Sequence, residues 1–181
     1  IKILDFENEE AERAFVLRNI IDGNVPMNEI FVLARTNRQL MELSRLMKMR
    51  GINHVVKEDE RGDGLQETGE RVTLATIHAI KGLEAKKVYV IGSNEQNFPC
   101  KASDHPAIEM VKSEDYDREE EERRLFYVAI SRAKEILFVT YSGKKPTYYI
   151  TNEMRMIVNM GLTDNGSLAT ENDTVNNEVD E

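Results

Sequence analysis

The sequence has little cysteine and no long apolar run. Cys100 is the single cysteine among 181 residues, so no disulfide can form within the chain and nothing requires an oxidising compartment. We interpret it as a free loop thiol. The three histidines, His54, His78 and His105, are scattered and have no cysteine at zinc-site spacing, so we predict no bound metal. No stretch of about 18 apolar residues occurs, which argues against a membrane-spanning helix.

Three further absences concern the start of the chain. Residues 1–5 lack the basic-then-apolar pattern of a secretion signal, and no initiator methionine is present. We therefore expect the chain to come from a longer polypeptide. A glycine-rich turn between a first strand and a first helix, which is typical of doubly wound nucleotide binders, is also missing.

The net charge of −9 is distributed unevenly. Residues 162–181 carry six acids and no lysine or arginine, and without them 24 basic residues stand against 27 acidic ones. This segment is also low in apolar residues, which predicts an acidic flexible tail after a folded domain of residues 1–161. The acidic total does not exclude a DNA-binding face, because phosphate contacts depend on local charge.

Apolar strand-like runs alternate with helical patterns through residues 1–161, which predicts an α/β fold with a mainly parallel sheet flanked by helices. The expected strands are Ile3–Phe6, Ile30–Ala34, His54–Lys57, Val72–Ala75, Lys87–Ile91 and Ile136–Tyr141. The expected helices are Glu7–Ile21, a helix capped by Thr36 or Asn37 that runs to Arg50, Arg118–Arg132, and Tyr148–Met160.

Helix ends and helix faces follow from the same patterns. Gly51 is expected to stop the second helix, while Pro146 opens the last helix and Gly161 ends it. Glu58–Glu70 is predicted to be a surface loop and Ser93–Asp117 to be irregular. The first helix is expected to bury Ala11, Ala14, Phe15 and Ile21, and the second to bury Leu40, Leu43 and Met47.

The first stretch with chemical character is VTLATIHAIKGLEAKKVYVIG, residues 72–92. Ligands of open parallel sheets bind beyond the carboxyl ends of the strands, and Thr76, His78 and Glu84 are predicted to lie in that region. Gly82 allows a ligand to approach the backbone closely. A capped turn, whose threonine and histidine satisfy only local backbone groups, explains the same residues equally well.

The second stretch is EEEERRLFYVAISRAKEILFVTY, residues 119–141. Arg132 stands among apolar residues at the end of the predicted helix, where a guanidinium needs an anion. That anion is either a nearby carboxylate, in a structural ion pair, or a nucleotide phosphate, which suits the fork of the guanidinium. Arg123 and Arg124 fit ion pairs along the helix.

A third stretch, IFVLARTN at residues 30–37, is a weak signal alone. In this order, the three stretches resemble the UvrD/Rep-type superfamily 1 DNA helicases. IFVLARTN resembles the motif before the insertion in the second domain, VTLATIHAIKGLE resembles motif V, and EEERRLFYVAISRAK resembles motif VI. Asn97-Phe98-Pro99 is similar to the Phe-Pro that follows motif V. The resemblance covers about residues 30–141.

The resemblance implies a RecA-like fold without its P-loop, acting as the C-terminal motor domain of a 3′ to 5′ helicase. Such enzymes hydrolyse ATP with Mg²⁺ in the cleft between this domain and an N-terminal RecA-like domain. Arg132 is implied to be the arginine finger that reaches the γ-phosphate, worth about 10³–10⁵ in rate. Glu84, with Gly82 beside it, is implied to contact the nucleotide sugar.

The resemblance also implies a track for single-stranded DNA. Thr76, His78 and Arg35 are implied to face the DNA, and Phe98 to stack on its bases, since aromatic stacking tolerates any base sequence. A role in DNA repair and a cytoplasmic, nucleoid-associated location in a bacterium, archaeon or phage go with this family. No membrane association is implied.

The chain departs from the family in what it lacks. GxxxxGK[ST] does not occur, and Gly143-Lys144-Lys145 has Phe138 where that motif needs a glycine. A Walker B acid pair and the adenine-stacking Asn-Tyr-Arg segment are missing, and only about 34 residues separate IFVLARTN from VTLATIH. We therefore expect the isolated chain not to hydrolyse ATP. Two alternatives stay open: a degenerate helicase-like domain acting as a nucleic-acid or protein scaffold, and an unrelated doubly wound small-molecule binder.

Overall fold

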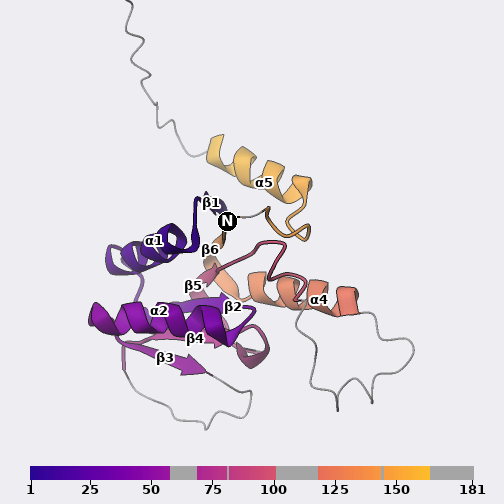
Figure 1. Cartoon of the computed structure of the whole chain (residues 1–181). Coiled ribbons are helices and arrows are strands. Elements are labelled where there is room, and N and C mark those ends of the chain that lie inside the picture. Colours follow the sequence, from indigo (N-terminus) through magenta and orange to yellow (C-terminus); the bar gives the residue numbers. More distant parts are fainter. Residues whose placement is uncertain (58–68, 81, 101–117, 144, 164–181) are drawn as a thin grey trace, which may run out of the picture.

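A computed structural model describes residues 1–57, 69–80, 82–100, 118–143 and 145–163, and a six-stranded sheet runs through its centre (Figure 1). The strand order is β1-β6-β5-β2-β4-β3, and all five pairings are parallel. The predicted α/β fold with a mainly parallel sheet is confirmed. The strands are β1 Lys2–Phe6, β2 Ile30–Ala34, β3 His54–Lys57, β4 Val72–Thr76, β5 Ala85–Val90 and β6 Ala133–Ser142.

Helices cover both faces of the sheet, so the domain has three layers. The helices are α1 Glu9–Ile21, η1 Met27–Glu29, α2 Asn37–Met49, η2 His78–Ile80, α4 Arg118–Ile130 and α5 Asn152–Thr163. On one face, α1 and α2 pack on Val32, Leu74 and Phe138 of the sheet. On the other, α4 and η2 pack on Leu33 and Val139. Buried strand residues alternate between the two cores, as two-sided burial of a parallel sheet requires.

The helix α2 forms as the sequence predicts. The Thr36 backbone N–H donates to Oε1 of Gln39 at 3.2 Å, which forms part of a capping box at the helix start. Leu40, Leu43 and Met47 are completely buried. Gly51, with φ of 68°, follows the helix end.

The buried face of α1 differs from the prediction. Its buried residues are Glu12, Val16, Leu17 and Ile20, whereas Ala14 is exposed and Ile21 is half exposed. The prediction took its face from apolar residues alone and did not include Glu12. The carboxylate of Glu12 instead accepts hydrogen bonds from the ends of β5 and β6, and this turns the helix.

The last helix also departs from the prediction. Pro146 does not open it but forms an isolated antiparallel bridge with Asn94. Tyr149 and Ile150 are buried in the core before α5 starts at Asn152. The helix then continues through Gly161 to Thr163, so this glycine does not terminate it.

Several predictions fall on parts that the structure does not describe. Most of the expected loop 58–70, residues 101–117 of the expected irregular stretch and the tail from residue 164 lie outside the described residues. The domain boundary at residue 161 stays a prediction. Among the described residues, no group of histidine, cysteine and acidic side chains could hold a metal ion, and no helix is long and apolar enough to cross a membrane.

Candidate functional site

A parallel sheet has two chemically different edges. All carboxyl ends of the strands lie at one, called here the carboxyl edge, and all amino ends lie at the other, the amino edge. Arg35 directly follows β2 and Thr76 ends β4, and Ala34 is paired with Thr76. His78 lies two residues further on, in η2. The structure therefore brings Arg35, Thr76 and His78 together at the carboxyl edge, with all three partly exposed.

Arg35 is part of a buried ion pair at this edge. Its Nε donates to Oε2 of Glu122 at 2.9 Å and to Oε1 at 3.1 Å, and its Nη2 also donates to Oε1. The side chains are 16% exposed for Arg35 and 5% for Glu122. The pair joins the end of β2 to the first turns of α4, across 87 positions of sequence. In this conformation the guanidinium binds a carboxylate of the protein itself.

The carboxylate of Glu122 has further partners. The backbone N–H of Cys100 donates to its Oε2 at 3.1 Å. Burial by itself raises the pKa of Glu122, but hydrogen bonds from Arg35 and Cys100 and the charges of Arg35 and His78 outweigh it, so the pKa lies below its ordinary value of 4.5. The ion pair therefore keeps a buried carboxylate charged, and it ties α4 to two other segments of the carboxyl edge.

The prediction that Phe98 stacks on DNA is contradicted by its burial. The ring is 0% exposed and packs edge-on against Phe126 of α4, with 5.4 Å between ring centroids. No face of the ring is open to a base. Phe98 instead anchors the segment after β5 in the core, and this segment carries the Cys100 N–H that contacts Glu122.

A tyrosine-lined pocket near the carboxyl edge escaped the sequence analysis. Tyr127 of α4 is 44% exposed and Tyr148 is 54% exposed, and both line a cavity of about 300 Å³ together with Arg123. Two exposed aromatic rings offer surfaces on which unpaired bases can stack, while Arg123 is ion-paired with Glu120, which also lines the cavity. The sequence signal for this pocket is the adjacent pair Tyr148-Tyr149 shortly after a predicted strand. The predicted helix Tyr148–Met160 included both tyrosines, so the pair was not recognised as part of a pocket.

The amino edge holds the other predicted residues. Ala85 begins β5 and Ala133 begins β6, so Gly82, Glu84 and Arg132 lie before the strands. The expectation that Glu84 shares an edge with Thr76 and His78 is therefore wrong. The structure does bring Gly82, Glu84 and Arg132 together, because the Ala85 N–H donates to the Arg132 carbonyl at 3.0 Å.

The guanidinium of Arg132 is positioned by neutral groups. Its Nε donates to the Val128 carbonyl at 3.0 Å, its Nη1 to the Leu83 carbonyl at 3.4 Å, and its Nη2 to Oγ of Ser131 at 3.0 Å. No described carboxylate lies within ion-pair distance of it. Of the two anions considered for Arg132, the internal carboxylate is thus not found among the described residues.

The surroundings of Arg132 are open. Glu84 is exposed, and a side-chain carbon added at Gly82, whose φ is 77°, would meet nothing within 4 Å. A partly exposed arginine, an exposed carboxylate and an unobstructed backbone turn therefore share one face. This combination can bind an anionic ligand that also carries hydroxyl groups. The guanidinium neutralises the anionic group, and the carboxylate accepts hydrogen bonds from the hydroxyl groups.

The two edges are joined by the connection 77–84, between β4 and β5. Its buried residues Ile77, Ala79 and Ile80 pack in the same core as α4. The Ile77 N–H donates to the Ala34 carbonyl at 3.2 Å, at the carboxyl edge, and the Leu83 carbonyl accepts from Arg132 at the amino edge. One short segment thus contacts both groups of candidate residues.

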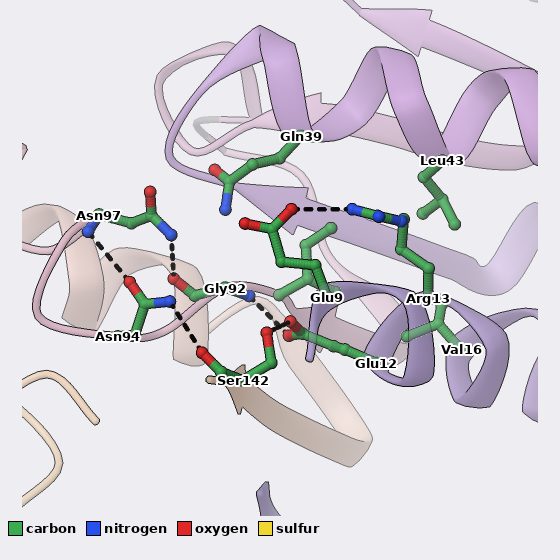
Figure 2. A pocket seen from close by; sticks show the side chains of 11 residues that line it. Glu9, Glu12, Arg13, Val16, Gln39, Leu43, Gly92, Asn94, Asn97 and Ser142 are labelled. Atoms are coloured by element: carbon green, nitrogen blue, oxygen red, sulfur yellow. Dashed lines mark hydrogen bonds and ion pairs between the residues drawn. The ribbon is translucent and has the colours of Figure 1, made fainter. Parts of the chain in front are cut away.

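A separate small cavity lies between α1, α2 and the strand ends, and Figure 2 shows its lining. Glu12, which is 4% exposed, accepts from the Gly92 N–H at 2.7 Å and from Oγ of Ser142 at 2.8 Å. The cavity volume is about 20 Å³, enough for one water molecule. We therefore assign this polar cluster a structural role.

Comparison with known proteins finds similarity to DNA helicases. Residues 56–144 match the family model of the UvrD-like helicase C-terminal domain. The ATP-dependent DNA helicase PcrA of Staphylococcus aureus strain Mu50 is 38% identical over 109 residues, which are 60% of this chain and 13% of that protein. A protein of Mycoplasma capricolum named probable DNA helicase II homolog is 38% identical over 86 residues, 48% of this chain and 11% of its own. The chain thus spans about one eighth of the length of these relatives.

One solved structure has the same fold. It is the C-terminal domain of a possible DNA helicase from Lactobacillus plantarum WCFS1, with a TM-score of 0.59 and 18% sequence identity. The alignment covers 84% of this chain and 81% of that one. The predicted RecA-like α/β fold and the resemblance of the chain to these helicases are confirmed.

Proposed function

Because this chain is a UvrD/PcrA-type helicase C-terminal domain, we propose that it is the second motor domain of an ATP-dependent DNA helicase. In this proposal an N-terminal RecA-like domain supplies the P-loop and most contacts to ATP and Mg²⁺. The chain lacks GxxxxGK[ST], and its described residues offer no metal-binding cluster. We expect the chain alone to bind ATP weakly and not to hydrolyse it.

The observation that carries the proposal is the presentation of Arg132. The guanidinium is held by two carbonyls and a hydroxyl rather than by a described carboxylate, so its charge remains available to an external anion. We assign it the role of arginine finger, which stabilises charge on the transferred phosphoryl group. Glu84 and the open turn at Gly82 then contact the nucleotide sugar, on the same edge.

The carboxyl edge is proposed to carry the single-stranded DNA, with 3′ to 5′ movement. Thr76 and His78 offer polar contacts there, and the tyrosine-lined pocket with Tyr127 and Tyr148 offers stacking surfaces. Arg35 can reach a phosphate only by sharing its guanidinium with Glu122. This arrangement places nucleotide and DNA at opposite edges of one sheet.

The alternative is a degenerate domain that serves as a binding scaffold. The juxtaposition of Gly82, Glu84 and Arg132 favours the motor, since a scaffold needs no anion-binding group held on the amino edge. A cytoplasmic, nucleoid-associated enzyme of DNA repair is consistent with this proposal.

The test uses the polypeptide that contains this domain together with a P-loop domain. Arg132→Ala should lower the DNA-stimulated ATPase rate by about 10³-fold or more and leave the affinity for oligothymidine within about threefold of wild type, because DNA contacts lie on the other edge. Arg124→Ala, on the exposed face of α4, serves as the control and should retain activity. Unchanged turnover in Arg132→Ala would refute the finger role.

A further inference from the structure

The helix α4 connects the two edges of the sheet. Glu122 lies in its first turns and Arg132 lies two residues after its end. Arg132 follows Glu122 by ten positions, which corresponds to about 15 Å along a helix. Leu125, Phe126 and Ala129 between them are buried in the core on one face of the sheet, so the helix forms a continuous packed connection between the two edges.

Glu122 is the point at which α4 is tied to the carboxyl edge. It accepts from Arg35 after β2 and from the Cys100 N–H after β5, and the charge of His78 acts on it. Removing one partner of a buried pair leaves a charge without compensation, so intermediate arrangements of this contact are unfavourable. The structure shows this contact formed, and coupling through it requires a second state in which it is broken.

We propose that Glu122 is a positioning residue that couples DNA binding at the carboxyl edge to the placement of Arg132 at the amino edge, through α4. The inference rests on the proposed motor function and adds a mechanism to it. A DNA phosphate that approaches Thr76 and His78 competes with the Glu122 carboxylate for the Arg35 guanidinium, since both are oxyanions that suit the same fork. A change in that contact shifts α4, and the shift reaches Arg132.

A purely structural ion pair gives a different expectation. Its loss lowers the unfolding temperature and affects the enzyme with and without DNA alike. A positioning role lowers specifically the factor by which DNA stimulates the ATPase. The ratio of turnover numbers with and without DNA therefore separates the two roles.

The experiment compares Glu122→Gln, Arg35→Lys and the control Glu121→Gln in the polypeptide that includes the P-loop domain. Gln keeps the shape of Glu122 without its charge, Lys keeps the charge of Arg35 without its fork, and Glu121 is the exposed neighbour in the same turn. ATPase turnover is measured with and without oligothymidine, and DNA affinity is measured by fluorescence anisotropy.

We expect the DNA stimulation of Glu122→Gln to fall about tenfold, within the usual range of couplings between sites. Turnover without DNA should stay within about threefold of wild type. DNA affinity should not fall, because a neutral amide competes less than a carboxylate with a DNA phosphate for Arg35. Arg35→Lys should show a smaller loss, and Glu121→Gln none. A wild-type stimulation factor in Glu122→Gln, whatever its unfolding temperature, overturns the inference.

A second measurement covers the case in which Glu122→Gln does not fold. It follows hydrogen exchange at the backbone of Ser131 and Arg132 in wild type and in Arg35→Lys. Oligothymidine should alter this exchange in wild type and not in the variant, and equal changes in the two proteins overturn the inference. An inactive Arg132→Ala combined with normal stimulation in Glu122→Gln rejects the coupling and keeps the motor. A fully active Arg132→Ala rejects the motor and the coupling together.

Discussion

Replacing Glu12 with alanine removes a buried carboxylate that joins α1 to the ends of two strands. Three donors lose their acceptor: the Gly92 N–H, the Thr140 hydroxyl and the Ser142 hydroxyl. Each buried donor without a partner costs about 1–3 kcal/mol, and since the hydroxyls can rotate toward other acceptors, the expected loss in unfolding free energy is about 4 kcal/mol. For a domain of this size, the unfolding temperature should fall by roughly 10 °C.

The assay is thermal and urea unfolding of the chain, followed by circular dichroism, with two companion variants. Glu12→Gln keeps an acceptor for Gly92 and Thr140 and places an amide against Ser142, so it should lose only about 1 kcal/mol. Glu10→Ala removes an exposed acid from the same helix and should change the stability by less than about 0.5 kcal/mol. If Glu12→Ala is as stable as Glu10→Ala, the assignment of Glu12 as the anchor of α1 is wrong.

Three further predictions concern the free energy of unfolding, measured in urea. Gly92→Ala should lower it more than Gly82→Ala does, because both positions have positive φ but only at Gly92 would the new carbon lie 2.0 Å from Nε2 of Gln39. Equal losses of unfolding free energy in the two variants would contradict the packing at Gly92. Leu40→Ala should lose about 2–5 kcal/mol, since the side chain is completely buried, and a loss near zero would contradict its place in the core. Because the folded-state pKa of Glu122 is lowered, its stabilising contribution is present above pH 4.5 and is lost as the pH falls through the folded-state pKa. In unfolding measurements from pH 7 to pH 3, wild type should therefore lose more unfolding free energy than Glu122→Gln. Equal pH dependence of the two proteins would count against this ion pair.

Continuous apolar runs and capping signals were sufficient to predict most of the fold. IFVLA at residues 30–34 is buried throughout, as a strand covered on both faces must be, and Thr36 and Gly51 bound α2 as expected. The face of α1 was mispredicted because burial of Glu12 depends on donors at residues 92, 140 and 142, which no local pattern of the helix reveals.

The candidate site was predictable in its members but not in its geometry. Motif resemblance identified Gly82, Glu84 and Arg132, which the structure places together. The ion pair between Arg35 and Glu122 joins residues 87 positions apart, and the burial of Phe98 follows from its contact with Phe126. Both depend on tertiary packing, which overrides what a residue type suggests by itself.

The length of the connection 77–84 has a consequence for sequence variation in this domain. Through their shared neighbour β2, Thr76 is level with Ile91, six residues beyond the start of β5, so the segment must return about 20 Å along the strands. Nine Cα–Cα steps reach at most roughly 30 Å, and the turn at η2 and the passage over β2 use much of the surplus. Related domains should therefore differ in this connection by substitutions and keep its length. A deletion of one residue would shorten the connection and move Glu84 away from Arg132.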